Sequence, residues 1–371
     1  MIKKRAIQGL TNILDFRMEL ALNYYEPLFE VMIEALRLRN QEVSLASAEF
    51  WSGLALNRME SEEDDVKRTE LVNQILPTLS PILLECCRFT KEDKIASLPF
   101  NNEDAIYGEN YYEQQEEEID EEYGQLEGLS TLRKASAFAF EKLAISSPNF
   151  IFDSIKPALD KYLQDESDLE GKEAAILVLG AISDEEGAYS HIEQYLQTLV
   201  PLLFNLLTNS HTKIKISTTW TLSKFSNWIA ANSGEDGIQV YIEKLCSLMK
   251  DSDLELCESA CCSLADIIES GKDRINSSLG VITMTYSQIC HSYNGKCLMA
   301  LLDVVGLLVD VCNDQLTDPK AVEIISTPLL NKLTALDYND KMIFPVLKCM
   351  IEVVKALGRL LSPVTNVITQ K

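Results

Sequence analysis

Histidine, strand-type patterns and long apolar runs are all scarce in this 371-residue sequence. Only three histidines are present, and no histidine or second cysteine pair completes a zinc site beside Cys257 and Cys261. No apolar stretch reaches about 18 residues and no signal peptide pattern opens the chain, so neither a membrane-spanning helix nor secretion is expected. We expect buried thiols at most of the ten cysteines, and no metal or cofactor.

Sequence motifs of common catalytic sites are also missing. The chain contains no phosphate-binding GxxxxGK[ST], no dinucleotide-binding GxGxxG and no GxSxG nucleophile elbow. We therefore expect no enzymatic activity and assign no catalytic residues.

Acidic residues, by contrast, are in excess. Against 33 Lys and Arg stand 57 Asp and Glu, which gives a formal net charge of −24. This balance argues against nucleic acid or an anionic membrane as a partner and favours basic ligands, although solubility alone would also account for it. Apolar residues make up 46% of the chain, enough for a substantial core.

Helical periodicity runs through nearly the whole sequence and is arranged in repeats. An apolar helix, a short polar turn and a second helix recur, with turns at Asn40, Asp165, Asn209 and Asp251. The last three turns are 44 and 42 residues apart, a spacing typical of HEAT-type hairpins, which must stack to bury both faces. The sequence predicts an all-α HEAT-repeat solenoid, a right-handed superhelix of about eight antiparallel hairpins.

One segment interrupts this pattern. Residues 91–128 contain Pro, Gly, Asn and a dense acidic block, and their low apolar content favours a mobile acidic loop. The block consists of Glu116, Glu117, Glu118, Asp120, Glu121 and Glu122. We expect helical hairpins over 1–90, the loop over 91–128, and further hairpins with a ligand-binding concave face over 129–371.

Acids recur on the predicted second helices of the hairpins, which line the concave surface of such a solenoid. Asp303 and Asp310 are seven residues apart in an otherwise apolar helix, so they share one stripe, separated by roughly 10 Å. Glu258 and Glu269 share a face of the preceding second helix. Such a row of carboxylates along neighbouring second helices suits the binding of an extended basic peptide. The alternative is that these acids only solvate an exposed helix face.

Earlier second helices add to this surface. Trp220 and Lys224 are one turn apart, and Glu141 lies further upstream. An indole would pack against an apolar or proline-containing part of a peptide. An enzyme is the rival interpretation, but the two carboxylates of glycosidases lie within about 9.5 Å of each other, which is closer than expected for the two aspartates.

Several segments resemble the transportin branch of the importin-β nuclear-import receptors. They include "STTWTLSKFSNWI", "STLRKASAFAFEKLA", "CESACCSLADIIE" and "LLDVVGLLVD", and they follow the order of the family over nearly the whole chain. The Trp-Thr-Leu-Ser and Asp-x-x-Gly-x-x-x-Asp pieces are the most discriminating.

The resemblance implies a HEAT superhelix that binds cargo through basic proline-tyrosine nuclear localisation signals and moves between cytoplasm and nucleus. Nucleoporins are further expected partners, and Ran–GTP is one only if the full protein has the N-terminal repeats that grip it. Matched family contact positions are Glu141, Leu177, Trp220, Lys224, Glu258, Glu269, Asp303 and Asp310. At Lys224 the family usually has Arg. The alternative function is a HEAT scaffold that has lost transport.

Overall fold

The computed structural model of the chain describes residues 2–56, 61–90, 131–183, 186–312, 316 and 319–357. All regular elements in these ranges are helical, and no strand occurs among them, as predicted. The expected loop 91–128, with Glu116, Glu117, Glu118, Asp120, Glu121 and Glu122, lies outside the described residues. The chain divides into two compact units, Met1–Gln197 and Thr198–Lys371.

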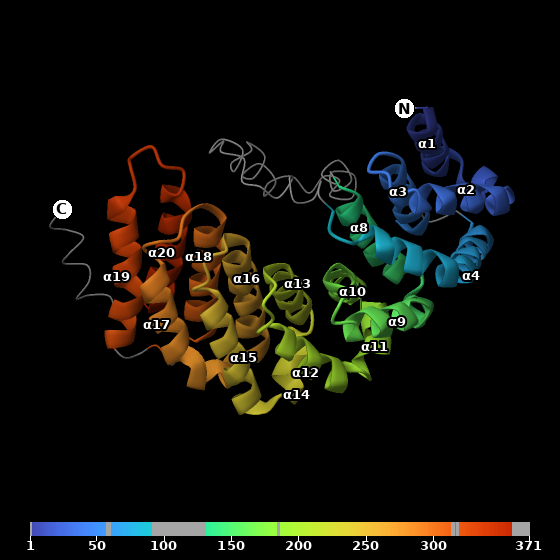
Figure 1. Cartoon of the computed structure of the whole chain (residues 1–371). Helices are drawn as coiled ribbons and strands as arrows, with labels where there is room; N and C mark the ends of the chain where they lie inside the picture. The colour runs from blue at the N-terminus through green and yellow to red at the C-terminus, as the bar shows by residue number, and fades with distance from the viewer. Residues whose placement is uncertain are drawn as a thin grey trace. The chain divides into compact units, whose positions relative to one another are not determined.

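The first unit stacks helical hairpins (Figure 1). Its helices are α1 (Ile2–Asn23), α2 (Tyr25–Arg37), α3 (Val43–Leu56), α4 (Glu62–Cys86), α8 (Leu132–Ser146), α9 (Pro148–Gln164), α10 (Leu169–Ile182) and the short α11 (Glu186–Glu193). The second helices α3, α8 and α10 pack in sequence, and α1 packs on α3 in the same row. The first helices α2, α4 and α9 form the other row.

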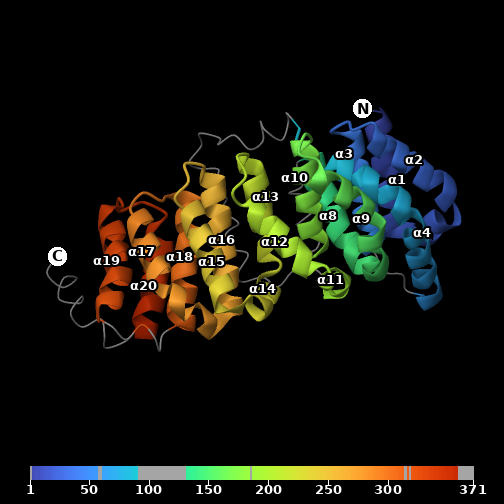
Figure 2. The same cartoon turned by 60° about the horizontal axis from the view of Figure 1, so that its bottom comes forward.

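The second unit repeats this plan (Figure 2). Its helices are α12 (Leu196–Leu206), α13 (Thr212–Ser223), α14 (Ser226–Asn232), α15 (Gly234–Leu248), α16 (Leu254–Gly271), the 3-10 helix η2 (Lys272–Ser278), α17 (Leu279–Ile289), α18 (Gly295–Val311), α19 (Pro319–Ala335) and α20 (Ile343–Leu357). The second helices α13, α16, α18 and α20 form one continuous row, while α15, α17 and α19 form the other. The predicted helical hairpins are thereby confirmed.

Internal prolines occur in several of the first helices. The first helices α4, α9, α12 and α19 each contain an internal proline, at Pro77 and Pro81, Pro157, Pro201 and Pro328 respectively. Proline removes one helical hydrogen bond and bends the helix. The second helices α3, α8, α10, α13, α16 and α18 contain no proline, and in α20 the one proline, Pro345, lies in the first turn, where no helical hydrogen bond is lost.

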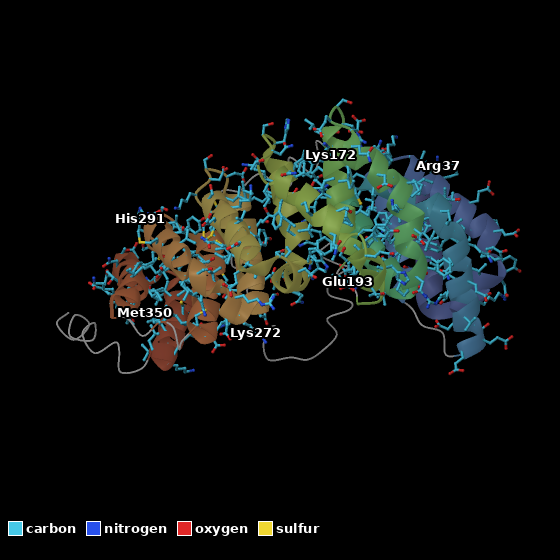
Figure 3. The ribbon with its side chains drawn as sticks, turned by 90° about the horizontal axis from the view of Figure 1, so that it is seen from below. Arg37, Lys172, Glu193, Lys272, His291 and Met350 are labelled. Carbon is cyan, nitrogen blue, oxygen red and sulfur yellow. The ribbon has the colours of Figure 1, made fainter. Side chains whose placement is uncertain are left out.

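A buried lysine fixes the turn that leads into α18. The Lys332 side chain from α19 is 7% exposed, and its Nζ donates to the Tyr293 carbonyl at 2.5 Å and to Asn294 Oδ1 at 2.9 Å. A longer contact of 3.4 Å reaches the carbonyl of His291, which is labelled in Figure 3. Burial lowers the pKa of Lys332. These bonds satisfy three oxygens of the turn and so position the start of α18.

Candidate functional site

The α18 helix is buried on all sides except one narrow stripe. Val304, Val305, Leu308 and Val309 are each 2% exposed or less, because α18 packs between α16 and α20. Asp303 and Asp310 are exposed on the remaining stripe. Two carboxylates interrupt the apolar run because this stripe is the part of α18 that solvent reaches.

Asp303 and Asp310 line a single open groove between α18 and α20. Its volume is about 700 Å³, and its α18 wall is completed by Gly306, Leu307 and Val309. The α20 wall consists of Glu352, Lys355 and Ala356. The predicted pair of aspartates therefore faces one shared space.

A third carboxylate reaches this groove across Gly306. A Cβ atom added at position 306 would lie only 2.5 Å from Glu352 Oε2, so the missing side chain lets Glu352 approach the α18 backbone between the two aspartates. Glycine at the fourth position of the Asp-x-x-Gly-x-x-x-Asp pattern therefore leaves room for this conformation of Glu352. The sequence prediction missed Glu352, although its spacing from Lys348 and Lys355, four and three residues, marks a charged stripe on the apolar α20.

The electrostatics of the groove are mixed rather than purely acidic. Burial raises the pKa of Asp303, the charge of Lys348 opposes this rise, and the Glu352 carboxylate adds to it. Lys355 lies in the lining itself. In the described part of the chain, no ion pair within 4.0 Å involves Asp303, Asp310, Lys348, Glu352 or Lys355, although such pairs occur elsewhere in the unit.

The α16 helix places a further acidic cluster beside Asp303. Cys262 is exposed; partial burial of its thiol, and then the charges of Glu258, Asp266 and Asp303, raise the thiol pKa, so these carboxylates lie near it. Glu258 is half-buried. Glu269 is exposed at the far end of α16 and does not line the groove.

On α13, the predicted aromatic and basic residues lie together. Lys224 Nζ sits 5.3 Å from the centroid of the Trp220 ring, within the range of a cation–π contact. The Trp220 side chain is partly exposed. A ligand that packs on the Trp220 ring therefore packs on a ring that the Lys224 ammonium group already contacts.

The two remaining predicted site residues belong to the first unit. Glu141 on α8 pairs with its neighbour Lys142 at 2.8 Å, and the Lys142 ammonium also lies over the Phe138 ring. Leu177 is partly exposed on α10. Both belong to the row of second helices of their own unit.

The chemistry open to the groove is the binding of cations. Carboxylates with no lysine or arginine in contact can accept hydrogen bonds from a guanidinium or an ammonium group. Over the described ranges, no group of three or more His, Cys, Asp or Glu side chains is arranged to hold a metal ion. No described helix is both long and apolar enough to span a bilayer.

Comparison with known proteins gives a consistent result. Residues 172–225 match a family model described as a HEAT-like repeat. Transportin from Dictyostelium discoideum is 26% identical over 414 residues, covering 96% of this chain and 43% of that protein. Human Transportin-1 is 31% identical over 226 residues, covering 61% of this chain and 25% of that protein.

Solved structures show the same fold. The structure entitled "Kap95:Nup1 complex" has a TM-score of 0.73 at 13% identity, with all of this chain aligned to 42% of that one. The HEAT-repeat solenoid predicted from the sequence is therefore confirmed. The chain is a homologue of the transportins and their importin-β relatives over most of its own length, and it spans less than half of the length of those it matches.

Proposed function

We propose that this chain is the cargo-binding part of a nuclear import receptor and binds basic proline-tyrosine localisation signals along its second helices. One observation carries the proposal. Asp303, Asp310 and Glu352 converge on one open groove, and none of them forms an ion pair with another described residue. Carboxylates left unpaired beside a groove are suited to bind the basic side chains of an extended peptide.

Homology supports the same assignment. The transportins are relatives over most of the chain, and the residues singled out by that resemblance include both groove aspartates. In this proposal Trp220 and Leu177 contact the apolar part of a signal, while Glu141, Glu258 and Glu269 interact with basic residues elsewhere along it. Lys224 contributes a cation where the family usually has arginine.

The wider partners are part of the same proposal. A receptor of this kind would move between cytoplasm and nucleus and contact nucleoporins. If the full protein has the N-terminal repeats that bind Ran–GTP, binding of Ran–GTP would release the cargo. The solved Kap95:Nup1 complex shows that a protein of this fold is found with such a partner. We propose no enzymatic reaction and no cofactor.

The test is a peptide titration with the charge-reversed variant Asp303→Lys with Asp310→Lys. Partly desolvated charge contacts cost about 2–5 kcal/mol when one partner is removed, so affinity for a basic proline-tyrosine peptide should fall at least tenfold. Trp220→Ala should weaken the same peptide with a smaller dependence on salt, because the lost contact is apolar.

A matched control separates local from general charge effects. Glu243→Lys with Glu323→Lys changes net charge equally, but these exposed residues lie on the first helices α15 and α19. This control should retain most of the affinity, and circular dichroism should show both variants folded. If the folded Asp303/Asp310 variant binds as well as wild type, the aspartates only solvate α18, and a HEAT scaffold without transport activity becomes the better description.

A further inference from the structure

Two lysines of α20 stand beside the acidic groove. Lys348, Glu352 and Lys355 are spaced by four and three residues and so share one stripe of an otherwise mainly apolar helix. Lys355 lines the groove together with Asp303 and Asp310. Lys348 is close enough to Asp303 for its charge to lower the pKa of that carboxyl.

These lysines are not held in ion pairs. Within the described ranges, neither Lys348 nor Lys355 has a carboxylate oxygen within 4.0 Å, whereas Lys213 pairs with Glu255 at 2.5 Å and Lys215 with Asp251 at 3.0 Å. Both α20 lysines are exposed. They add positive charge at the groove without neutralising any one acid by direct contact.

The resulting charge balance limits what the groove can attract. Of the lining residues, Asp303, Asp310 and Glu352 contribute three negative charges and Lys355 one positive charge. Lys348 nearby adds a second positive charge, which leaves a net charge of −1 before the α16 acids Glu258 and Asp266, which lie outside the lining, are counted. One cationic side chain that enters among the carboxylates is attracted by the nearest of them. A second or third cation beside it would approach the lysines, and like charges repel over such short distances.

We propose that Lys348 and Lys355 are specificity-determining residues, which favour peptides that present one isolated arginine or lysine to this groove over peptides with a run of adjacent basic residues. The inference rests on the proposed function, because it concerns the same groove and the same class of ligand. On this inference the groove selects peptides by the spacing of their basic residues. Repulsion from the α20 lysines, rather than attraction to the acids, produces this selection.

The experiment compares two synthetic peptides of equal length that end in Pro-Tyr. One contains a single arginine and the other contains three adjacent arginines at the same site. We expect the three-arginine peptide to bind the double variant Lys348→Ala with Lys355→Ala about five- to tenfold more tightly than it binds wild type. The single-arginine peptide should gain less than about twofold in the same titration at low salt.

The control variant is Lys67→Ala with Lys250→Ala, which removes two exposed lysines that do not line the groove and do not lie on α18 or α20. It should change the affinity of either peptide by less than about twofold. Equal gains for the two peptides, no gain for either, or the same gain in the control would overturn the proposal. Melting temperatures check folding, and Lys348→Gln with Lys355→Gln replaces the alanine variant if that one is unstable.

The Asp303→Lys with Asp310→Lys variant separates this inference from the proposed function. If it loses both peptides while the α20 lysine variant shows no change in preference, the function stands and the specificity inference fails. If it binds both peptides as wild type does, or if wild type binds neither, the proposed function fails and the inference fails with it.

Discussion

The two units join neighbouring repeats by different chemistry. In the first unit, Arg133 on α8 and Glu173 on α10 form a bidentate pair at 2.6 and 2.8 Å, with side chains only 13% and 4% exposed. Arg88, beyond the end of α4, makes a similar fork to Asp168 at the start of α10. The acids at these repeat junctions are therefore occupied by arginine.

The second unit relies more on neutral donors. Ser263 on α16 donates to the Thr219 carbonyl on α13 at 3.2 Å, and the Tyr293 hydroxyl donates to the Met249 carbonyl one repeat earlier. Ion pairs do occur between repeats, but the pairs of Lys213 with Glu255 and of Lys215 with Asp251 use lysine in place of a bidentate arginine. The groove carboxylates of α18 and α20 remain unpaired among the described residues.

The difference shows that one fold can use its acids in two ways. Acids buried between repeats and bound by arginine contribute to structure and offer little to a ligand. Acids left exposed on second helices cost little to keep, because solvent reaches them, and they stay available for a basic partner. Exposure and pairing, more than the number of acids, distinguish the two uses.

The largest effect should come from breaking the buried pair of the first unit. Glu173→Ala leaves the Arg133 guanidinium buried without its partner and should lower the free energy of unfolding by about 3–5 kcal/mol. Asp160→Ala, which removes the exposed Lys156–Asp160 pair, should cost less than about 0.5 kcal/mol. Urea titrations of both variants measure the contrast, and equal costs would remove the distinction between the two kinds of acid.

A smaller effect is expected from the neutral junctions of the second unit. Tyr293→Phe removes the hydroxyl that donates to Met249 and leaves that carbonyl without this donor, at a cost of about 1–1.5 kcal/mol. Tyr338→Phe is the matched control, because Tyr338 is 95% exposed and should tolerate the change. Urea unfolding should place Tyr293→Phe between the control and Glu173→Ala, and a loss as large as that of Glu173→Ala would contradict the comparison.

A still smaller, pH-dependent effect should follow from Asp303→Asn. Because burial raises the pKa of Asp303 in the folded protein, the folded state holds this proton more tightly than the unfolded state does. The contribution of Asp303 to stability is therefore greatest below the ordinary carboxyl pKa of about 3.9 and is lost as the pH rises through the raised value. At pH 7 the asparagine variant should be more stable than wild type, by less than about 0.5 kcal/mol, the usual limit for an exposed substitution.

The measurement is urea unfolding of wild type and Asp303→Asn at several pH values between 4 and 8. The advantage of the variant should shrink as the pH falls. Glu243→Gln, an exposed change of equal charge on α15, gives the general effect of removing one negative charge. A pH-independent difference would show that the environment of Asp303 does not discriminate between its two protonation states.

The smallest effect should come from replacing residues 104–126 with a short Gly-Ser linker. Both ends of the intervening segment are anchored in the first unit, since Arg88 binds Asp168 and Arg133 donates to the Cys87 carbonyl at 2.5 Å. Closing a loop of different length between fixed ends costs little, so the melting temperature should move by about 2 °C or less. A fall of about 5 °C or more would mean that the replaced residues stabilise the first unit.

The sequence was sufficient to predict the hairpins and part of the groove. Helical periodicity and the spacing of Asp165, Asn209 and Asp251 predicted the repeats, because each hairpin is a local structure. The shared stripe of Asp303 and Asp310 followed from helix geometry alone. Both inferences needed only distances within one helix or one repeat.

The remainder depended on how neighbouring repeats pack. Glu352 lies across Gly306 because α20 packs beside α18 in one particular register, and no spacing within either helix specifies that register. Partners contributed by an adjacent repeat become visible only in the folded unit.

The burial of the cysteines has a practical consequence for observing the groove. Nine of the ten thiols are buried, and Cys262, among Glu258, Asp266 and Asp303, is the exposed one. A maleimide dye should therefore attach to the native protein at this one position, at a mildly alkaline pH because the thiol pKa is raised. The unmodified sequence thus provides a single attachment point for a fluorescent reporter, beside the helix to which a basic peptide is proposed to bind.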